Sequence, residues 1–374
     1  MVDIRNIVVL MYIIIGYMTS ISILVRSDDV FLILFGTLLL AHVLCWSGYM
    51  HHELCHYSVF EKRKWNIYFG RLLDWLNGAC YWPFEELREQ HVKHHVYKVD
   101  YDTASGIICQ LQANSFFNNI LLWSEYFYIP SHAFIIHWRS VLAPWWSKER
   151  KSMRLRTVLI LMIRTIYFFI LYYLRDPLVL VCYFIAYSIS IQIIRFTDAF
   201  SHTYEVVPVD TPRKYQSKMY DMSHTYTIEF ETNEQTSKIV KLLAQFIHVG
   251  VFLNFNFHNQ HHYSTQKKWF ELGSSFITND NFIEDNQDEN VDDQNNQPNK
   301  QEITTHQSNS GSLCGVPKNH YTISLSAALR AFHIHRLKRI YGDPGKPFYD
   351  PISKIISLDN YYGVADASVL VLEL

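Results

Sequence analysis

The stretch FLILFGTLLLAHVLCWSGYMHHELCH, residues 31–56, decides the fold, because an apolar run of membrane-crossing length leads directly into a cluster of histidines. The apolar part, Phe31–Tyr49, is close to the roughly 20 residues that a helix needs to cross the hydrocarbon core of a bilayer. Only His42 interrupts it with an ionisable side chain. We therefore predict a transmembrane helix that ends beside the cluster His51–His56.

Three further apolar runs complete a pattern of two pairs. Ile4–Arg26 precedes the quoted stretch and is separated from it by Ser27-Asp28-Asp29. It is longer than the apolar core of a cleaved signal peptide, and a second run follows at once, so we interpret it as a span. Thr157–Leu174 and Leu178–Ile194 flank Arg175-Asp176-Pro177, where the proline breaks the helix. The sequence thus predicts two transmembrane hairpins.

The basic segment Arg139–Arg156 orients these spans, because positively charged loops stay in the cytoplasm. With two spans before it and two after it, every histidine cluster lies on that same face. We expect an all-α integral-membrane fold, with four transmembrane helices in two hairpins. Arg164, inside the third span, is expected to face protein or to snorkel. Three interrupted apolar segments are expected to be interfacial or re-entrant: Trp65–Pro83, Ser115–Trp138 and Ile239–Phe257.

The C-terminal part of the chain differs in composition. Glu284–Lys300 consists almost entirely of Asp, Glu, Asn and Gln, and such a tract cannot bury enough apolar surface to fold. We therefore divide the chain into a membrane domain at residues 1–277, a disordered insertion at 278–314 and a C-terminal cytosolic amphipathic segment at 315–374. Within the last segment, Leu325–Tyr341 has the pattern of a basic amphipathic helix at the membrane surface, or equally of an ordinary packing helix.

Charge and cysteine content exclude two classes of protein. The formal net charge of −2 gives no basic field that would attract a nucleic acid. The six cysteines are scattered and form no C-x-x-C pair, so we expect no disulfide framework. Histidine, by contrast, is unusually frequent, with 19 copies.

The histidines form three clusters whose spacing suits metal binding. Residues three and four apart share one face of a helix, so each cluster can aim two or three imidazoles at one point. Zinc takes about four ligands, whereas imidazole also suits iron, and two irons can use all eight of these side chains. The candidate ligands are His52 and His56, then His91, His94 and His95, then His258, His261 and His262.

Two other kinds of protein remain as alternatives. His52 to His56 also fits the H-E-x-x-H helix of a membrane zinc hydrolase, with Glu53 as general base. That interpretation leaves the two H-x-x-H-H clusters without a role. A non-catalytic membrane scaffold with a decayed site is the third possibility, and the complete set of clusters argues against it. Metal analysis separates the three, because they predict iron, zinc and no metal.

The order and flanks of the clusters resemble the membrane fatty-acid desaturase and hydroxylase superfamily. HELCHYSVF, QHVKHHVYKVD and FNFHNQHHYSTQKKWFEL are similar to that family's three histidine boxes, and the resemblance covers roughly residues 30–272. It implies an O2-dependent enzyme of the endoplasmic reticulum, in which the two transmembrane hairpins lie under a cytosolic helical cap that holds two irons. Such enzymes oxidise unactivated C–H bonds of a lipid by desaturation or hydroxylation, and the sequence does not name the lipid. No fused haem or flavin motif is present, so a separate electron-donor protein is implied.

The resemblance also implies a ninth histidine ligand. Enzymes similar to the stearoyl-CoA desaturases place it after the fourth span, four residues beyond an asparagine that holds iron through water. The matching position here is His202, and Asp198 stands where the asparagine is expected. We expect Asp198 either to ligate iron directly or to orient the His202 ring.

Overall fold

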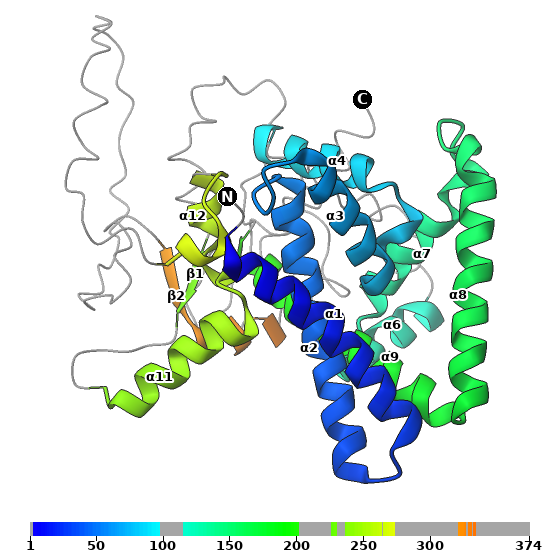
Figure 1. The fold of residues 1–374 in the computed structure, drawn as a ribbon, viewed down its shortest axis with the longest axis horizontal. Helices are drawn as coiled ribbons and strands as arrows, with labels where there is room; N and C mark the ends of the chain where they lie inside the picture. The colour runs from blue at the N-terminus through cyan, green and yellow to red at the C-terminus, as the bar shows by residue number, and fades with distance from the viewer. Residues whose placement is uncertain are drawn as a thin grey trace, which may run out of the picture.

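The computed structural model describes residues 3–97, 115–201, 226–229, 236–263, 265–273, 321–326, 328–330 and 332–333. Within these ranges the chain is mostly helical (Figure 1). The predicted insertion, the segment 334–374 and His202 lie outside the described residues, so the predictions for them stay predictions.

In the part of the chain that the structure describes, four helices are long and apolar enough to cross a membrane, as predicted. The protein is therefore an integral membrane protein whose first and second spans are joined by a three-residue turn. An aspartate caps the start of each of these two helices, since Asp3 accepts from the Arg5 N–H and Asp29 from the Leu32 N–H. The four helices are α1 (Ile4–Arg26), α2 (Val30–Cys55), α8 (Arg154–Leu174) and α9 (Pro177–Ser201).

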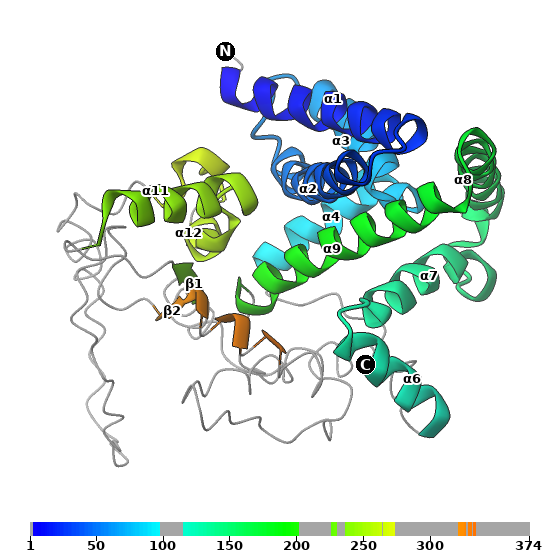
Figure 2. The same cartoon turned by 90° about the horizontal axis from the view of Figure 1, so that it is seen from below.

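Helix α2 forms the centre of the helical bundle. Helices α1 and α9 pack against it, and α8 stands at the periphery (Figures 1 and 2). Only 17% of the most apolar window of α8 is buried, against 39–44% for the other three candidate spans. Its outward face carries exposed apolar side chains such as Ile163 and Phe169, which is expected of a helix that faces lipid.

Two helical segments connect the second span to the second histidine cluster. Helix α3 (Arg63–Asn77) ends at Gly78, whose φ of 90° a residue with a side chain would rarely adopt. The short helix η1 (Ala79–Tyr81) and helix α4 (Phe84–Tyr97) follow. Gly70 lets α3 and α4 approach closely, because a side chain there would meet the ring of Phe84.

Arginines of α8 satisfy the carbonyl groups at the end of α3 and of η1. Arg164 donates to the Trp75 carbonyl, and Arg156 donates to the carbonyls of Cys80 and Tyr81 at 2.7 and 2.6 Å. Arg164 stands about 15 Å along α8 from Arg154, at ~1.5 Å per residue. The end of α3 therefore lies well down the length of a span, and Arg164 faces protein, as one of the two alternatives predicted.

A third group of helices leads to the last histidine cluster. Helix α11 (Lys238–Phe246) continues into the π-helical turn η4 (Ile247–Val251), and η5 (Phe255–Phe257) precedes α12 (His258–Tyr263). Both His42 and Trp46 of α2 donate to the carbonyl of Gly250 in η4. These two polar side chains of the second span thus hold a stretch of irregular backbone.

The segment Ser115–Trp138, which was predicted to be interfacial or re-entrant, forms parts of two shorter helices. They are α6 (Ser115–Tyr126) and α7 (Ser131–Trp146), and neither is among the candidate spans. A buried ion pair joins this segment to α9, because Arg195 Nη1 lies 3.0 Å from Glu125 Oε2. The depth of these helices in the bilayer remains a prediction.

A pair of short strands departs from the all-α fold that the sequence predicts. Strand β1 (Tyr226–Glu229) pairs in parallel with β2 (Tyr321–Ser324), and Thr227 and Ile228 of β1 are buried. Both strands read Tyr-Thr-Ile, and aromatic and β-branched residues favour strands. The fold is therefore mostly helical, with one short parallel ladder between distant parts of the chain.

Candidate metal centre

Three helix ends carry the predicted histidine clusters to one place. His52 lies in the last turn of α2, and His56 follows as the residue that caps its C-terminus. Helix α4 carries the second cluster and α12 the third, and the ends of these helices approach the end of α2 (Figures 1 and 2). The i, i+4 spacing on α2 and α4 and the i, i+3 spacing on α12 turn the side chains to a common side.

Five histidines bring their ring nitrogens into one tight group. The Nε2 atoms of His56 and His91 are 2.7 Å apart, and His261 Nε2 is 3.0 Å from His56 Nε2. One ligand atom from each ring lies within 4.8 Å of every other in the group formed by His52, His56, His91, His95 and His261.

His258 lies beside this group. Its side chain is buried, and its ring is stacked on that of His261 with the centroids 5.2 Å apart. The centroids of His258 and His52 are 5.1 Å apart. All six candidate histidine ligands whose side chains the structure describes therefore lie in or beside one site.

The protonation state of the site favours metal binding. Burial, with a further contribution from the positive charge of Arg88, lowers the pKa of His56 to about 4. His56 is therefore neutral near pH 7, the state in which an imidazole offers a lone pair. Both ring nitrogens of His52 are buried without a hydrogen-bond partner among the described residues.

These features fit a metal cation. Several neutral imidazoles that face one another at such short distances place their lone pairs in mutual repulsion unless a cation or protons lie between them. A buried imidazole with no hydrogen bond, such as His52, is costly unless a ligand compensates it. A borderline cation such as iron or zinc satisfies both conditions, because imidazole is a ligand that both metals accept.

The side chain of Glu53, next to His52, takes part in a buried hydrogen-bond network. Its side chain is 1% exposed, and its Oε2 accepts from the Ser58 hydroxyl at 3.0 Å and from the Trp269 N–H at 3.3 Å. Its Oε1 is 3.8 Å from His52 Nδ1, which is too far for a hydrogen bond. The carboxylate therefore links the end of α2 to the chain that follows the third cluster.

Trp269 is the meeting point of this network. Its indole N–H donates to Asn6 of α1 at 2.9 Å, and its carbonyl accepts from the Asn254 side chain at 3.1 Å. With the bond to Glu53, three separate segments converge on one residue. Trp269 thus fixes the position of the third cluster relative to the first.

His51 and Asp74 form a second support behind the site. His51 Nδ1 lies 2.7 Å from Asp74 Oδ1 of α3, at ion-pair distance although outside hydrogen-bond geometry. The His51 ring meets the Phe84 ring edge-on, with the centroids 5.3 Å apart. The structure thus places His51 against α3 and α4 and outside the group of five histidines.

The structure does not bring the remaining predicted ligands into the group of five histidines. His94 and His262 are on α4 and α12, but their side chains are not described. His202 lies outside the described residues. Asp198 is exposed on α9 and does not belong to the group of five histidines. Ligation by these four residues remains a prediction.

Sequence reasoning missed the supports of the site. Glu53 was considered only as a hydrolytic base, and the roles of Asp74 and Trp269 had no local signal, because their partners are far away in the sequence. Glu53 and Trp269 are 216 positions apart. Only the placement of Glu53 between two histidines hinted at a supporting role.

Comparison with known proteins gives one match. The family model described as fatty acid desaturase matches residues 29–276, more than half of the chain. No curated protein and no solved structure matches this chain.

Proposed function

Because this chain belongs to the fatty acid desaturase family, we propose that it is an O2-dependent desaturase or hydroxylase of a lipid chain, with two irons held by histidine. The observation that supports this function best is the group of five histidines from three separate segments, whose ligand atoms lie within 4.8 Å of one another. Imidazoles in this number suit iron and exceed what one zinc ion takes.

The proposed ligands are the eight box histidines together with a ninth from the end of the fourth span. When bound, the iron pair supplies the activation of O2 that removal of hydrogen from an unactivated C–H bond requires. The proposed set is His52, His56, His91, His94, His95, His202, His258, His261 and His262, with Asp198 as ligand or as support for His202.

The chain's own residues hold and isolate this centre. Neutral imidazoles leave the positive charge of the metals uncompensated, which favours oxidation of a reluctant bond. His258 and His261 are almost fully buried, so bulk water has little access from their side. The Phe255 ring packs against the rings of His52 and Tyr49, with centroid distances of 4.9 and 4.5 Å respectively. It provides an apolar contact beside the histidines.

The setting proposed for this reaction follows the charge pattern and the family. Two hairpins span the membrane of the endoplasmic reticulum, and the helices that carry the histidines form a cap on the cytosolic side. The basic segment Arg139–Arg156 supports that orientation. The substrate is a lipid within the same membrane, and a separate protein delivers the electrons.

A membrane zinc hydrolase is the second candidate, and the position of Glu53 argues against it. A general base must reach the water that it activates. Glu53 instead accepts from the Ser58 hydroxyl and from the Trp269 N–H while almost fully buried. The hydrolase would also leave His91, His95 and His261 without a function.

Metal analysis of the purified full-length protein, paired with lipid profiling of cells that express it, tests the proposed function. We expect iron in the protein and new double bonds or hydroxyl groups in cellular lipids. His52→Ala should remove both results, whereas His137→Phe, a change on α7 outside the group of five histidines, should keep the iron. Zinc without iron, or a lipid profile identical to that of cells without the protein, would contradict the proposal.

Asp198 and His202 allow a separate test of the ninth ligand. They are spaced i, i+4, so both can point to the same site from the end of the fourth span. We expect His202→Ala to lower iron occupancy and abolish activity. Asp198→Asn restores the family's usual residue and should keep the iron, whereas Asp198→Ala should weaken the site more. A fully active, iron-loaded His202→Ala protein would remove the ninth ligand from the proposed set.

A further inference from the structure

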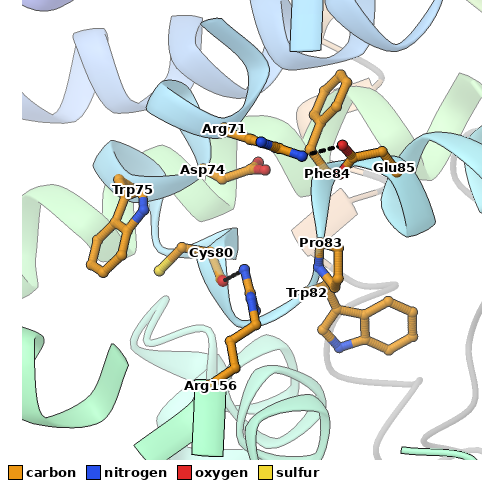
Figure 3. Close-up of a pocket in the computed structure, with 9 residues that line it drawn as sticks. All are labelled: Arg71, Asp74, Trp75, Cys80, Trp82, Pro83, Phe84, Glu85 and Arg156. Carbon is orange, nitrogen blue, oxygen red and sulfur yellow. Dashed lines mark hydrogen bonds and ion pairs between the residues drawn. The ribbon is translucent and has the colours of Figure 1, made fainter. Parts of the chain in front are cut away.

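A polar pocket lies between α3, η1, α4 and α8 (Figure 3). Its volume is about 240 Å³. None of the residues that line it belongs to the proposed iron ligands. They are Arg71, Asp74, Trp75, Cys80, Trp82, Pro83, Phe84, Glu85 and Arg156.

The wall of the pocket carries two positive and two negative side chains. Arg71 and Glu85 form an ion pair at the rim, with side chains 62% and 41% exposed. The side chain of Asp74 is only 3% exposed, and its carboxylate is turned toward the interior of the pocket in Figure 3. The guanidinium of Arg156 enters from the opposite side (Figure 3). A ligand in this pocket therefore meets charges of both signs.

The pocket lies at the level of lipid headgroups. Arg156 is in the first turn of α8, and the candidate span that contains α8 begins at Lys151. Headgroups lie at the ends of transmembrane spans, and tryptophan is enriched at the same level. Trp82, which lies under Arg150 just before the start of that span, agrees with this position, whereas Trp75 lines the deeper end of the pocket beside Arg164. The chemistry of the wall should thus match a headgroup.

The charges select a zwitterionic headgroup. An anion alone would lie against the carboxylates of Asp74 and Glu85, and a cation alone would lie against Arg71 and Arg156. A headgroup that carries a phosphate and an ammonium avoids both repulsions. An additional carboxylate, as in a serine headgroup, would again meet the two acids.

The aromatic rings favour a primary over a quaternary ammonium. A trimethylammonium group has no N–H to donate and is bound on open aromatic faces. Here the Arg150 guanidinium already covers Trp82, at 3.3 Å from the ring centroid, and Arg164 lies 5.5 Å from that of Trp75. The Phe84 ring is fully buried against His51. With these faces taken, a primary ammonium that donates to carboxylates fits better.

We propose that this pocket binds the phosphoethanolamine headgroup of a membrane lipid. Arg71 and Arg156 bind the phosphate, and the ammonium donates hydrogen bonds to Asp74 and Glu85. None of the residues that line the pocket is a proposed iron ligand, so binding of the headgroup does not require the proposed oxidation. Asp74 connects the two regions, because its Oδ1 lies 2.7 Å from His51 Nδ1.

A lipid-binding titration of the full-length protein in detergent tests this assignment. Native mass spectrometry compares three lipids with identical acyl chains, bearing ethanolamine, choline or serine headgroups. We expect the ethanolamine lipid to bind about tenfold more tightly than the choline lipid, because one charge-assisted hydrogen bond is lost with choline. Arg71→Gln should weaken the binding of both the ethanolamine and the choline lipid, because it removes a phosphate contact. Glu85→Gln should reduce the preference for the ethanolamine lipid.

Matched variants separate a lost ligand contact from a damaged fold. Glu149→Gln changes an exposed carboxylate that pairs with Ser147 outside the pocket, and it should bind all lipids as the native protein does. Asp74→Asn is informative where its thermal melting matches that of the native protein, and the ethanolamine preference should then disappear. Equal binding of the ethanolamine and choline lipids by the native protein would overturn the proposal. Binding of soluble phosphoethanolamine as tight as that of the lipid would overturn the lipid assignment.

Discussion

Replacing Glu53 by alanine should loosen the link between the first and third histidine clusters. The change removes the acceptor of the Trp269 N–H, and Trp269 is 6% exposed, so water cannot replace that acceptor freely. An unsatisfied buried donor costs about 1–3 kcal/mol. The Ser58 hydroxyl loses less, because it also donates to the Glu53 backbone carbonyl at 2.9 Å.

A total loss of about 2 kcal/mol corresponds to a fall in Tm of roughly 2–3 °C for a chain of 374 residues, because the entropy of unfolding is about 2.1 cal/mol/K per residue. We expect Glu53→Ala to melt lower in detergent and to contain less iron. Glu53→Gln keeps a side-chain oxygen that accepts from Trp269, and its Tm and iron content should stay near the native values. A double-mutant cycle with Ser58→Ala should show coupling, because both residues belong to one network.

Two results would refute this reasoning. A Glu53→Ala protein with native Tm and full iron content would show that the carboxylate does not support the site. Loss of a hydrolytic activity in both Glu53→Ala and Glu53→Gln, with metal and Tm unchanged, would instead make Glu53 a general base and favour the hydrolase.

Four further predictions follow from the structure and the charge pattern. Arg164→Met should lower Tm in detergent, since the Trp75 carbonyl loses its donor inside the bundle, and a native Tm would contradict this role. Burial lowers the pKa of His248 to about 4, so its contribution to stability is complete above the unfolded pKa near 6.5 and falls as the pH decreases toward 4. The loss should reach roughly 2 kcal/mol at pH 5; His248→Gln should therefore lose less Tm than the native protein between pH 7.5 and pH 5, and equal losses would count against it. Deletion of residues 284–300 should leave membrane insertion and iron content intact, and loss of iron would show that the tract is structural. A cysteine in place of Lys148 should react with an impermeant thiol reagent from the cytosolic side, and reaction only from the lumenal side would reverse the proposed topology.

Features that depend on local sequence were predictable. The apolar run Phe31–Tyr49 gave the position of the second span, although the observed helix continues to Cys55. Its backbone hydrogen bonds continue past the apolar run, because helix formation does not require membrane burial. The spacing within the histidine clusters likewise predicted which faces of α2, α4 and α12 bring their histidines together.

Features that depend on distant partners were not predictable. The ladder between β1 and β2 joins two short segments that are far apart in the sequence, and each is too short to give a periodic signal. The polar residues within the spans were recognised, but their partners were not. His42 donates to the Gly250 carbonyl, and Arg164 donates to the Trp75 carbonyl. Neither pairing can be predicted from hydropathy.

The carbonyl caps inside the spans have a consequence for the order in which the protein is assembled during synthesis. The end of α3 leaves the ribosome before Arg164, the residue that satisfies its Trp75 carbonyl, has been made. An unsatisfied carbonyl in hydrocarbon costs several kcal/mol, so we expect the end of α3 to settle against the bundle only after α8 has entered the membrane. For the η4 turn the order is reversed, because the donors His42 and Trp46 are synthesised before Gly250, whose carbonyl they satisfy. We therefore expect α3, which leads to the helix of the second cluster, to take its place late in synthesis, whereas the segment before the third cluster can pack at once against α2.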